Sequence, residues 1–212
     1  MKVKISVPER RSAWVLRWLL FTIGVGCLGF YCYSYVYRTG YQIYEGWQFD
    51  RETTDEAPPV KTRVGLPVVL PDADRGTART ATKAKIIGRL TIPRLHVSLI
   101  VEEGVDKLTL ARAVGHIPGT ALPGERGNVG VAGHRDTFFR ALKDLQPNDE
   151  ITFTTHSGSF HYLVESLTVV EPSNIGVLKP TDRQSLTMVT CFPFNYVGNA
   201  PRRFIVRAVS ML

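Results

Sequence analysis

The sequence predicts an all-β domain, either a closed barrel or a sandwich, behind one N-terminal membrane-spanning helix. Three observations support this prediction. A charge-free apolar run covers residues 18–37, seven or eight short β-branched segments follow residue 85, and little of the remaining chain has a helical period. A chain of 212 residues is long enough for one or two domains with a substantial core. Its hydrophobic content of 44% and charged content of 21% are those of an ordinary folded protein.

The apolar run at 18–37, WLLFTIGVGCLGFYCYSYVY, is long enough for a helix to span the hydrocarbon core of a bilayer. Five basic residues and one acidic residue precede it in residues 1–17, which predicts a cytoplasmic N-terminus and an external remainder. Much of the formal net charge of +7 lies in this tail, so the charge does not indicate nucleic-acid binding. We expect an uncleaved signal-anchor, because bulky aromatic residues occupy the place of a small-residue cleavage site. A cleavable signal peptide is the alternative.

The chain therefore divides into four predicted regions. They are a cytoplasmic basic tail (1–17), a transmembrane signal-anchor (18–37), an extracytoplasmic linker (38–84) and a folded domain (85–212). The linker contains four prolines, many threonines and mixed charges, and its apolar residues have no sustained period. This composition predicts an extended tether.

Short segments rich in β-branched residues and bounded by turn residues predict the strands of the folded domain. These segments cover residues 86–92, 96–104, 129–134, 150–155, 160–170, 185–191 and 203–210. One or two helical turns are expected at 106–114, a loop at 115–128 and a short helix at 137–145. Closing such a sheet on itself removes its unpaired edges, which favours a barrel.

One cysteine, Cys191, lies in the external region, since Cys27 and Cys32 fall inside the apolar run. External cysteines usually form disulfides, and Cys191 has no partner within its own domain. It is therefore either a buried inert thiol or a thiol kept free for reaction. Cys191 ends one predicted strand, and the adjacent Arg202 and Arg203 open the next.

A cysteine nucleophile reacts as the thiolate, which an adjacent imidazole or guanidinium favours. His134 is the candidate imidazole, because it stands at the end of a predicted strand and directly before a predicted helix. His116, in the preceding loop, is a weaker candidate for lining the same groove. Asp136 is expected to cap the helix that follows His134 rather than to orient its ring.

This combination resembles sortases, the membrane-anchored cysteine transpeptidases of bacterial surfaces. Residues 187–191 read TMVTC where the family has T-L-x-T-C, and the exchange of Met for Leu conserves volume. Residues 132–134 read AGH, the context of the family's histidine, and RRFIVRA at 202–208 is similar to the strand of its arginine. The resemblance covers about residues 86–210 and looks most like the class D group.

The resemblance implies that residues 85–212 form a catalytic, closed, eight-stranded β-barrel with short helices. It also implies that Cys191 is the nucleophile, His134 the general acid and base, and Arg203 the group that stabilises the oxyanion or the substrate carbonyls. We expect Arg203 rather than Arg202, because neighbouring residues of a strand point to opposite faces.

Thr190 and His116 are the weaker candidates for substrate contact. For Thr190, which precedes the nucleophile, an ordinary β-forming residue is an equal alternative.

The resemblance further implies cleavage of an LPxTG-like sorting signal between Thr and Gly, through a thioacyl intermediate that an amine resolves. The implied partners are surface proteins with such a C-terminal signal, and an amine acceptor such as a cell-wall precursor or a pilin lysine. The implied location is the bacterial cell membrane, with a single span.

No cofactor or metal is expected, because no Cys/His spacing typical of zinc and no calcium-type loop is present, although calcium dependence stays open. Two other functions remain open from the residues alone. One is a thiol hydrolase, and the other is a non-catalytic, membrane-tethered β-barrel binding module with Cys191 in its core.

Overall fold

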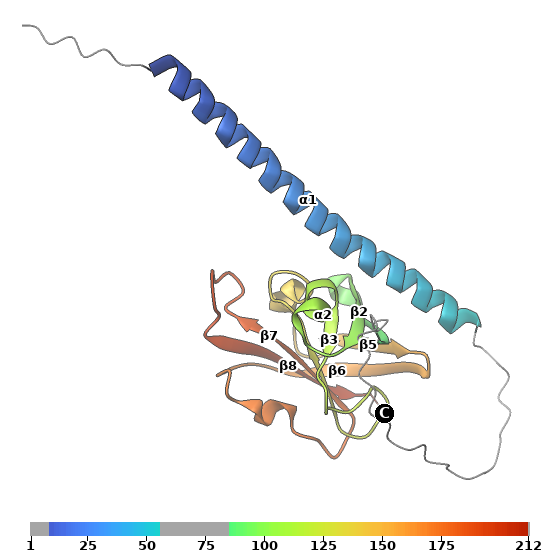
Figure 1. Cartoon of the computed structure of the whole chain (residues 1–212). Coiled ribbons are helices and arrows are strands. Elements are labelled where there is room, and N and C mark those ends of the chain that lie inside the picture. Colours follow the sequence, from blue (N-terminus) through green and yellow to red (C-terminus); the bar gives the residue numbers. More distant parts are fainter. Residues whose placement is uncertain (1–8, 56–84, 212) are drawn as a thin grey trace, which may run out of the picture. The chain divides into compact units, whose positions relative to one another are not determined.

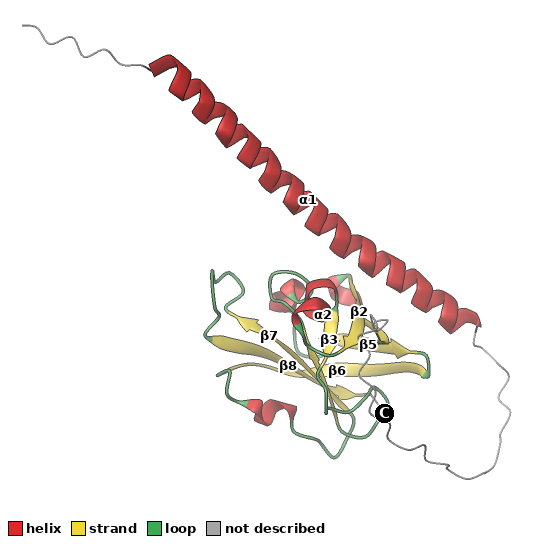
Figure 2. Ribbon diagram, in the orientation of Figure 1, coloured by secondary structure: helices red, strands yellow, loops and turns green. Residues whose placement is uncertain are grey.

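The computed structural model describes residues 9–55 and 85–211 (Figures 1 and 2). The chain divides into two compact units, Met1–Ile43 and Tyr44–Leu212. Most of helix α1 (Glu9–Asp55) belongs to the first unit. Its segment Trp14–Arg51 has a mean hydropathy of 1.7 in its most apolar window and is long enough to cross a membrane. The expected N-terminal helix of membrane-spanning length is therefore present.

Helix α1 continues beyond its predicted end. Residues 38–55, expected to begin the extended tether, are helical, whereas 56–84 lie outside the described residues. Extending a formed helix costs far less than starting one, and no proline interrupts this stretch. Contacts within the second unit also hold its end. Phe49 is 2% exposed and packs edge-on against the ring of His156, with 4.9 Å between centroids, and Arg89 pairs with Asp50 at 3.0 Å.

Within residues 85–211, eight strands form a closed barrel in the order β1-β2-β3-β4-β7-β8-β6-β5. The strands are β1 (Ile86–Ile92), β2 (Val97–Glu103), β3 (Val114–His116), β4 (Asn128–Ala132), β5 (Glu150–Thr155), β6 (Gly158–Val170), β7 (Ser185–Phe192) and β8 (Arg202–Ser210). The short helices are η1 (Pro93–Leu95), α2 (Lys107–Arg112), η2 (Arg140–Asp144) and η3 (Ile175–Leu178). The predicted eight-stranded closed barrel is confirmed.

Two strand pairs of this barrel are parallel, β2 with β3 and β4 with β7, and the other pairs are antiparallel. Strand β3 is the strand that the sequence did not predict, since Val114 fell in an expected helical turn and residues 115–116 fell in an expected loop. The parallel pairing of β4 with β7 is the most consequential, because it brings the carboxyl ends of two distant strands to the same end of the barrel.

Alternate residues of β4 and β7 fill the barrel. Val129 and Val131 of β4 and Leu186 and Met188 of β7 are all at most 1% exposed. Met188, the residue that departs from the sortase motif, thus has its side chain in the core, where an unbranched thioether substitutes readily for leucine.

The side chain of Asn128 fixes the register of β4 against β7 at the end remote from their carboxyl termini. Its Oδ1 accepts hydrogen bonds from the hydroxyls of Thr187 (2.8 Å) and Ser185 (3.3 Å). Its Nδ2 donates to the carbonyls of Val177 (3.1 Å) and Lys179 (3.3 Å). Asn128 is 2% exposed, so any other alignment of the two strands would leave buried polar groups unpaired.

A charged pair joins η1 to the start of β5. Arg94 donates through Nε and Nη2 to the carboxylate of Asp149, which also accepts from the backbone nitrogen of Gln146 at 2.7 Å. Arg94 additionally donates to the carbonyl of Asp144 at 2.6 Å. The hydrogen bond from Arg94 holds the pKa of Asp149 below its ordinary value, because it stabilises the ionised carboxylate.

Candidate active site

Cys191 lies near the carboxyl end of β7, directly opposite Arg203 at the start of β8. Directly opposed residues of antiparallel strands point to the same face, with Cβ atoms about 5 Å apart. Arg202 opposes Phe192 instead, and its guanidinium carbon lies 5.5 Å from the centre of the Phe192 ring. The strand register therefore puts Arg203 rather than Arg202 beside the thiol. Cys191 is a free thiol and partly exposed.

Strand β4 delivers His134 to the same end of the barrel. Its parallel pairing with β7 keeps one register along its length and ends with Ala132 opposite Val189. Carried two residues further, that register brings His134 level with Cys191. Neighbouring strands lie about 4.8 Å apart, which is within the reach of an imidazole and a thiol. His134 is exposed.

Gly133 anchors the histidine turn to β7. Its nitrogen donates to the carbonyl of Val189 (3.2 Å), and its carbonyl accepts from the hydroxyl of Thr190 (2.8 Å). The buried ring of Phe139 covers this glycine so closely that a Cβ added there would lie 2.9 Å from the ring. The nitrogen of Phe139 also donates to the carbonyl of His134 at 3.0 Å. Close packing therefore explains why glycine precedes the histidine.

The two weaker candidates are not at the surface of the site. Thr190 is 2% exposed, and its hydroxyl is committed to the carbonyl of Gly133. His116 is also 2% exposed, with Nδ1 2.9 Å from Glu103 Oε2 and Nε2 3.0 Å from the carbonyl oxygen of Ala121. Neither side chain is placed for the substrate contact predicted from the sequence. Thr190 instead supports the histidine turn, and His116 supports the loop between β3 and β4.

The chain after His134 forms turns and then the 3-10 helix η2, instead of the helix predicted over 137–145. The N-cap position of η2 is Phe139, with no side-chain capping hydrogen bond. The prediction that Asp136 is the N-cap is therefore wrong. The turn after His134 places the N-cap at Phe139, three residues later.

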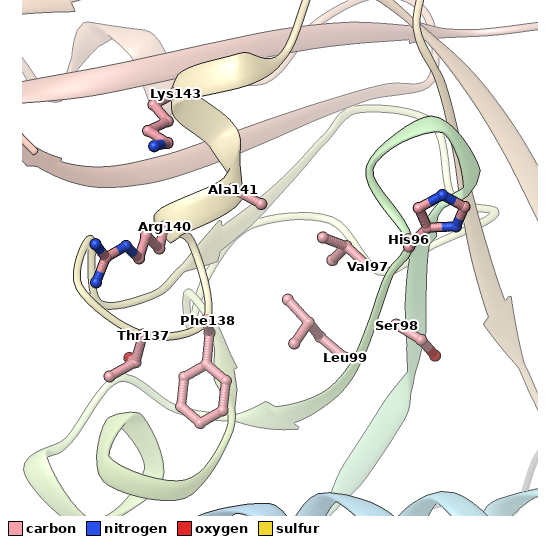
Figure 3. A pocket seen from close by; sticks show the side chains of 9 residues that line it. All are labelled: His96, Val97, Ser98, Leu99, Thr137, Phe138, Arg140, Ala141 and Lys143. Carbon is pink, nitrogen blue, oxygen red and sulfur yellow. The ribbon is translucent and has the colours of Figure 1, made fainter.

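A hollow of about 480 Å³ lies between η2 and the start of β2 (Figure 3). Val97 and Leu99 point into it toward Phe138 and Ala141, so its floor is apolar (Figure 3). None of the three catalytic candidates lines this hollow. It is a separate feature of the surface beside the histidine turn.

Sequence reasoning missed Arg135. This residue follows His134, and its Nη2 donates to the carbonyls of Tyr196 (2.7 Å) and Gly198 (3.0 Å), in the loop between β7 and β8. Adjacency to the histidine was the only signal in the sequence, because the partners are backbone carbonyls. No group of three or more metal-ligating His, Cys, Asp or Glu side chains occurs in the described part of the chain.

Comparison with known proteins identifies the family. Residues 90–211, more than half of the chain, match the sortase domain. Sortase D of Bacillus subtilis is 34% identical over 120 residues, 56% of this chain and 61% of that protein. Sortase SrtE1 of Streptomyces coelicolor is 39% identical over 123 residues, 49% of this chain and 35% of that protein. The matches therefore span less than two thirds of either curated relative.

A solved structure agrees with these sequence matches. The Sortase D5 transpeptidase of Clostridium perfringens is 33% identical, with a TM-score of 0.55 over 60% of this chain and 79% of that one. Both comparisons include class D sortases, as the motifs predicted. This chain belongs to the sortase family.

Proposed function

We propose that this protein is a membrane-anchored cysteine transpeptidase that cleaves an LPxTG-like sorting signal between Thr and Gly and transfers the acyl group to an amine. The observation that carries the proposal is the direct pairing of Cys191 with Arg203 across β7 and β8. The β4–β7 register, extended two residues beyond Ala132, supports a position of His134 beside Cys191 on the other side. A nucleophile, a proton carrier and a fixed cation on adjacent strands are what acyl transfer through a covalent intermediate requires.

In the first half-reaction, the thiolate of Cys191 attacks the carbonyl carbon of the substrate threonine and forms a C–S bond. Arg203 donates charge-assisted hydrogen bonds to the oxyanion that develops on the carbonyl oxygen. The C–N bond to glycine then breaks, and protonated His134 gives its proton to the departing amine. The product is a thioester between the enzyme and the threonine carbonyl.

In the second half-reaction, an amine attacks the thioester carbon and neutral His134 takes its proton. The tetrahedral intermediate collapses with release of the sulfur as thiolate, which restores the starting pair of thiolate and imidazolium. Water in the place of the amine would give hydrolysis. The acceptor must therefore be held near the thioester more effectively than water.

Helix α1 supports a location in the membrane. Its apolar segment and the basic residues 1–17 support a single-pass anchor in the bacterial cell membrane with a cytoplasmic N-terminus. The barrel would then lie outside the membrane, where surface proteins with C-terminal sorting signals are exported. A cell-wall precursor or a pilin lysine would supply the amine. No cofactor enters this chemistry.

Incubation of the protein with an LPxTG-type peptide, with and without an amine, tests the proposal by mass spectrometry. The wild-type protein should form a thioester adduct on Cys191, and Cys191→Ala should form no adduct and no ligated product. Unchanged turnover in Cys191→Ala would refute the mechanism. Ligated product should replace hydrolysed product when the amine is added, and continued hydrolysis alone would make the protein a thiol hydrolase.

The partial exposure of Cys191 argues against the binding-module alternative, which needs an inert core thiol. Alkylation of the native protein with iodoacetamide separates the two functions. Rapid labelling of Cys191 that His134→Ala or Arg203→Ala slows is expected for the enzyme. A thiol that resists the reagent in the folded protein would support the binding module.

A further inference from the structure

We propose that Arg135 is a positioning residue that locks the β7–β8 loop (193–201) onto the histidine turn and, through this loop, holds Arg203 beside the thiol. The inference rests on the proposed function, since it assigns Arg203 to the oxyanion. Arg135 itself contacts neither the thiol nor the imidazole in the described hydrogen bonds.

The first step is the reach of Arg135 across the site. It directly follows His134 in the chain, yet its Nη2 donates to Tyr196 (2.7 Å) and Gly198 (3.0 Å) of the opposite loop. Its guanidinium carbon also lies 5.9 Å from the centre of the Tyr196 ring. Hydrogen bonds from a charged donor are stronger than neutral ones. The histidine turn and the loop are thereby tied together.

The second step is that Arg203 holds the same loop from its other side. Its Nη1 donates to the carbonyls of Ala200 (3.2 Å) and Arg202 (3.0 Å). Two guanidinium groups thus bind carbonyls of the short stretch 196–202. A shift of this stretch moves the carbonyls that orient Arg203, and Arg203 is the group opposite Cys191.

The third step is that packing holds the start of the loop but not its tip. Phe194 packs edge-on against Phe204 and Phe192, with 5.2 Å and 6.1 Å between ring centroids. Val197 at its tip is 95% exposed, so packing does not hold that residue. Within the loop, the backbone nitrogen of Tyr196 donates to the carbonyl of Pro193 at 3.3 Å. The shape of the loop from Tyr196 to Ala200 therefore depends on the two arginines.

The fourth step is an unfavourable feature of Arg135. Its second terminal nitrogen, Nη1, is enclosed and has no hydrogen-bond partner among the described residues. An enclosed donor without a partner costs free energy, and this cost accompanies the placement of the guanidinium against the loop. The favourable contacts that offset this cost are the two hydrogen bonds to the loop.

Steady-state kinetics with a sorting-signal peptide test the proposal. Arg135→Ala should lower kcat on the order of 10- to 100-fold, because a small displacement of a stabilising group weakens its contact with the transition state, and KM should stay near the wild-type value. Arg135→Lys, which keeps the charge but loses the planar fork, should restore part of the rate. Arg140→Ala is the matched control, since Arg140 is an exposed arginine on the same segment.

A double-mutant cycle tests whether Arg135 acts through Arg203. Single-turnover rates of thioester formation are compared for Arg135→Ala, Arg203→Ala and the double variant. If the loop couples the two residues, Arg135→Ala should have little further effect once Arg203 is absent. Additive losses, or a wild-type kcat in Arg135→Ala, would overturn the proposal.

Hydrogen exchange of the amides in 193–201 gives a readout that needs no substrate. These amides should exchange faster in Arg135→Ala than in wild type, while those of β4 and β7 remain unchanged. Unchanged exchange in the loop would also overturn the proposal. A wild-type protein that cleaves no signal peptide would instead refute the proposed function. Arg135→Lys replaces Arg135→Ala in each measurement if the alanine variant does not fold.

Discussion

Two histidines of this barrel each follow a glycine on neighbouring strands, yet their surroundings are opposite. His116 ends β3, is 2% exposed and has both ring nitrogens within hydrogen-bond distance of oxygens. His134 follows β4, is exposed, and its ring makes no hydrogen bond among the described residues. The local sequence is the same Gly-His pair. Whether surrounding residues bury the imidazole, and not the Gly-His sequence itself, distinguishes the structural His116 from the catalytic candidate His134.

Of the variants that test this comparison, replacement of His134 should have the largest effect on activity. His134→Ala should lower kcat for peptide cleavage roughly 10²- to 10⁴-fold, because proton transfer to and from the amine is lost. The melting temperature should stay at the wild-type value, since the ring is exposed and unbonded within the described structure. Kinetics and thermal unfolding, measured on one preparation, check the lower kcat and the unchanged melting temperature. A stability loss with normal kcat would reverse the roles of the two histidines.

Gly133→Ala should have the next largest effect, since it displaces the histidine turn without touching the imidazole. The added Cβ would lie 2.9 Å from the Phe139 ring, so the turn or the ring must move. We expect a loss in kcat of roughly 10- to 100-fold, because misplaced catalytic groups are costly. Adding Phe139→Leu should recover part of the rate by making room, and Phe139→Leu alone is the control. A wild-type rate in Gly133→Ala would show that the turn tolerates displacement.

His116→Ala should affect stability more than rate. It leaves Glu103 and the carbonyl of Ala121 without their partner, which should lower the free energy of unfolding by about 1–3 kcal/mol. Urea unfolding measures this change. His161→Ala is the matched control, because His161 lies 3.0 Å from the carboxylate of Glu150 but about half of each side chain is exposed. Equal losses of unfolding free energy in the two variants would show that burial does not determine how much each histidine contributes to stability.

The smallest effect, a change in the pH dependence of stability, is expected at the Arg94–Asp149 pair, which lies away from both histidines. The pKa of Asp149 is below its ordinary value in the folded protein, so its ionised form adds stability above the ordinary pKa. This contribution is lost as the pH falls through the lowered pKa. Asp149→Asn should therefore reduce stability at neutral pH and flatten its decline in acid, as thermal unfolding over a pH series can measure. A decline as steep as in wild type would exclude Asp149 as a contributor.

The longer strands were predictable because each has its own local pattern. β1 at 86–92 and β5 at 150–155 have the predicted bounds, since β-branched runs there end at turn residues. β3 was not predicted, because three residues carry no period of their own. Its pairing with β2 and β4 defines it, and those partners are separate in the chain.

The candidate site was predictable only in part for a similar reason. Alternation along a strand was enough to select Arg203 over Arg202, and the observed register of β8 agrees. The Thr190 hydroxyl bonds to the backbone carbonyl of Gly133, and His116 is buried by the fold around it. Both depend on how separate segments of the chain pack together. Sequence spacing contains no information on such encounters, so both residues were assigned to the substrate.

Asn128, at the start of β4, affects how loss of the native strand register would reduce activity. A sheet slips only in whole residues, and a slip of one turns every side chain of the strand to the other face. Loss of the buried amide of Asn128 would weaken the preference for the native register, and any slipped molecules would be inert and would form a mixture with the competent ones. An ensemble assay would read this mixture as a fall in active-enzyme concentration with an unaltered Michaelis constant.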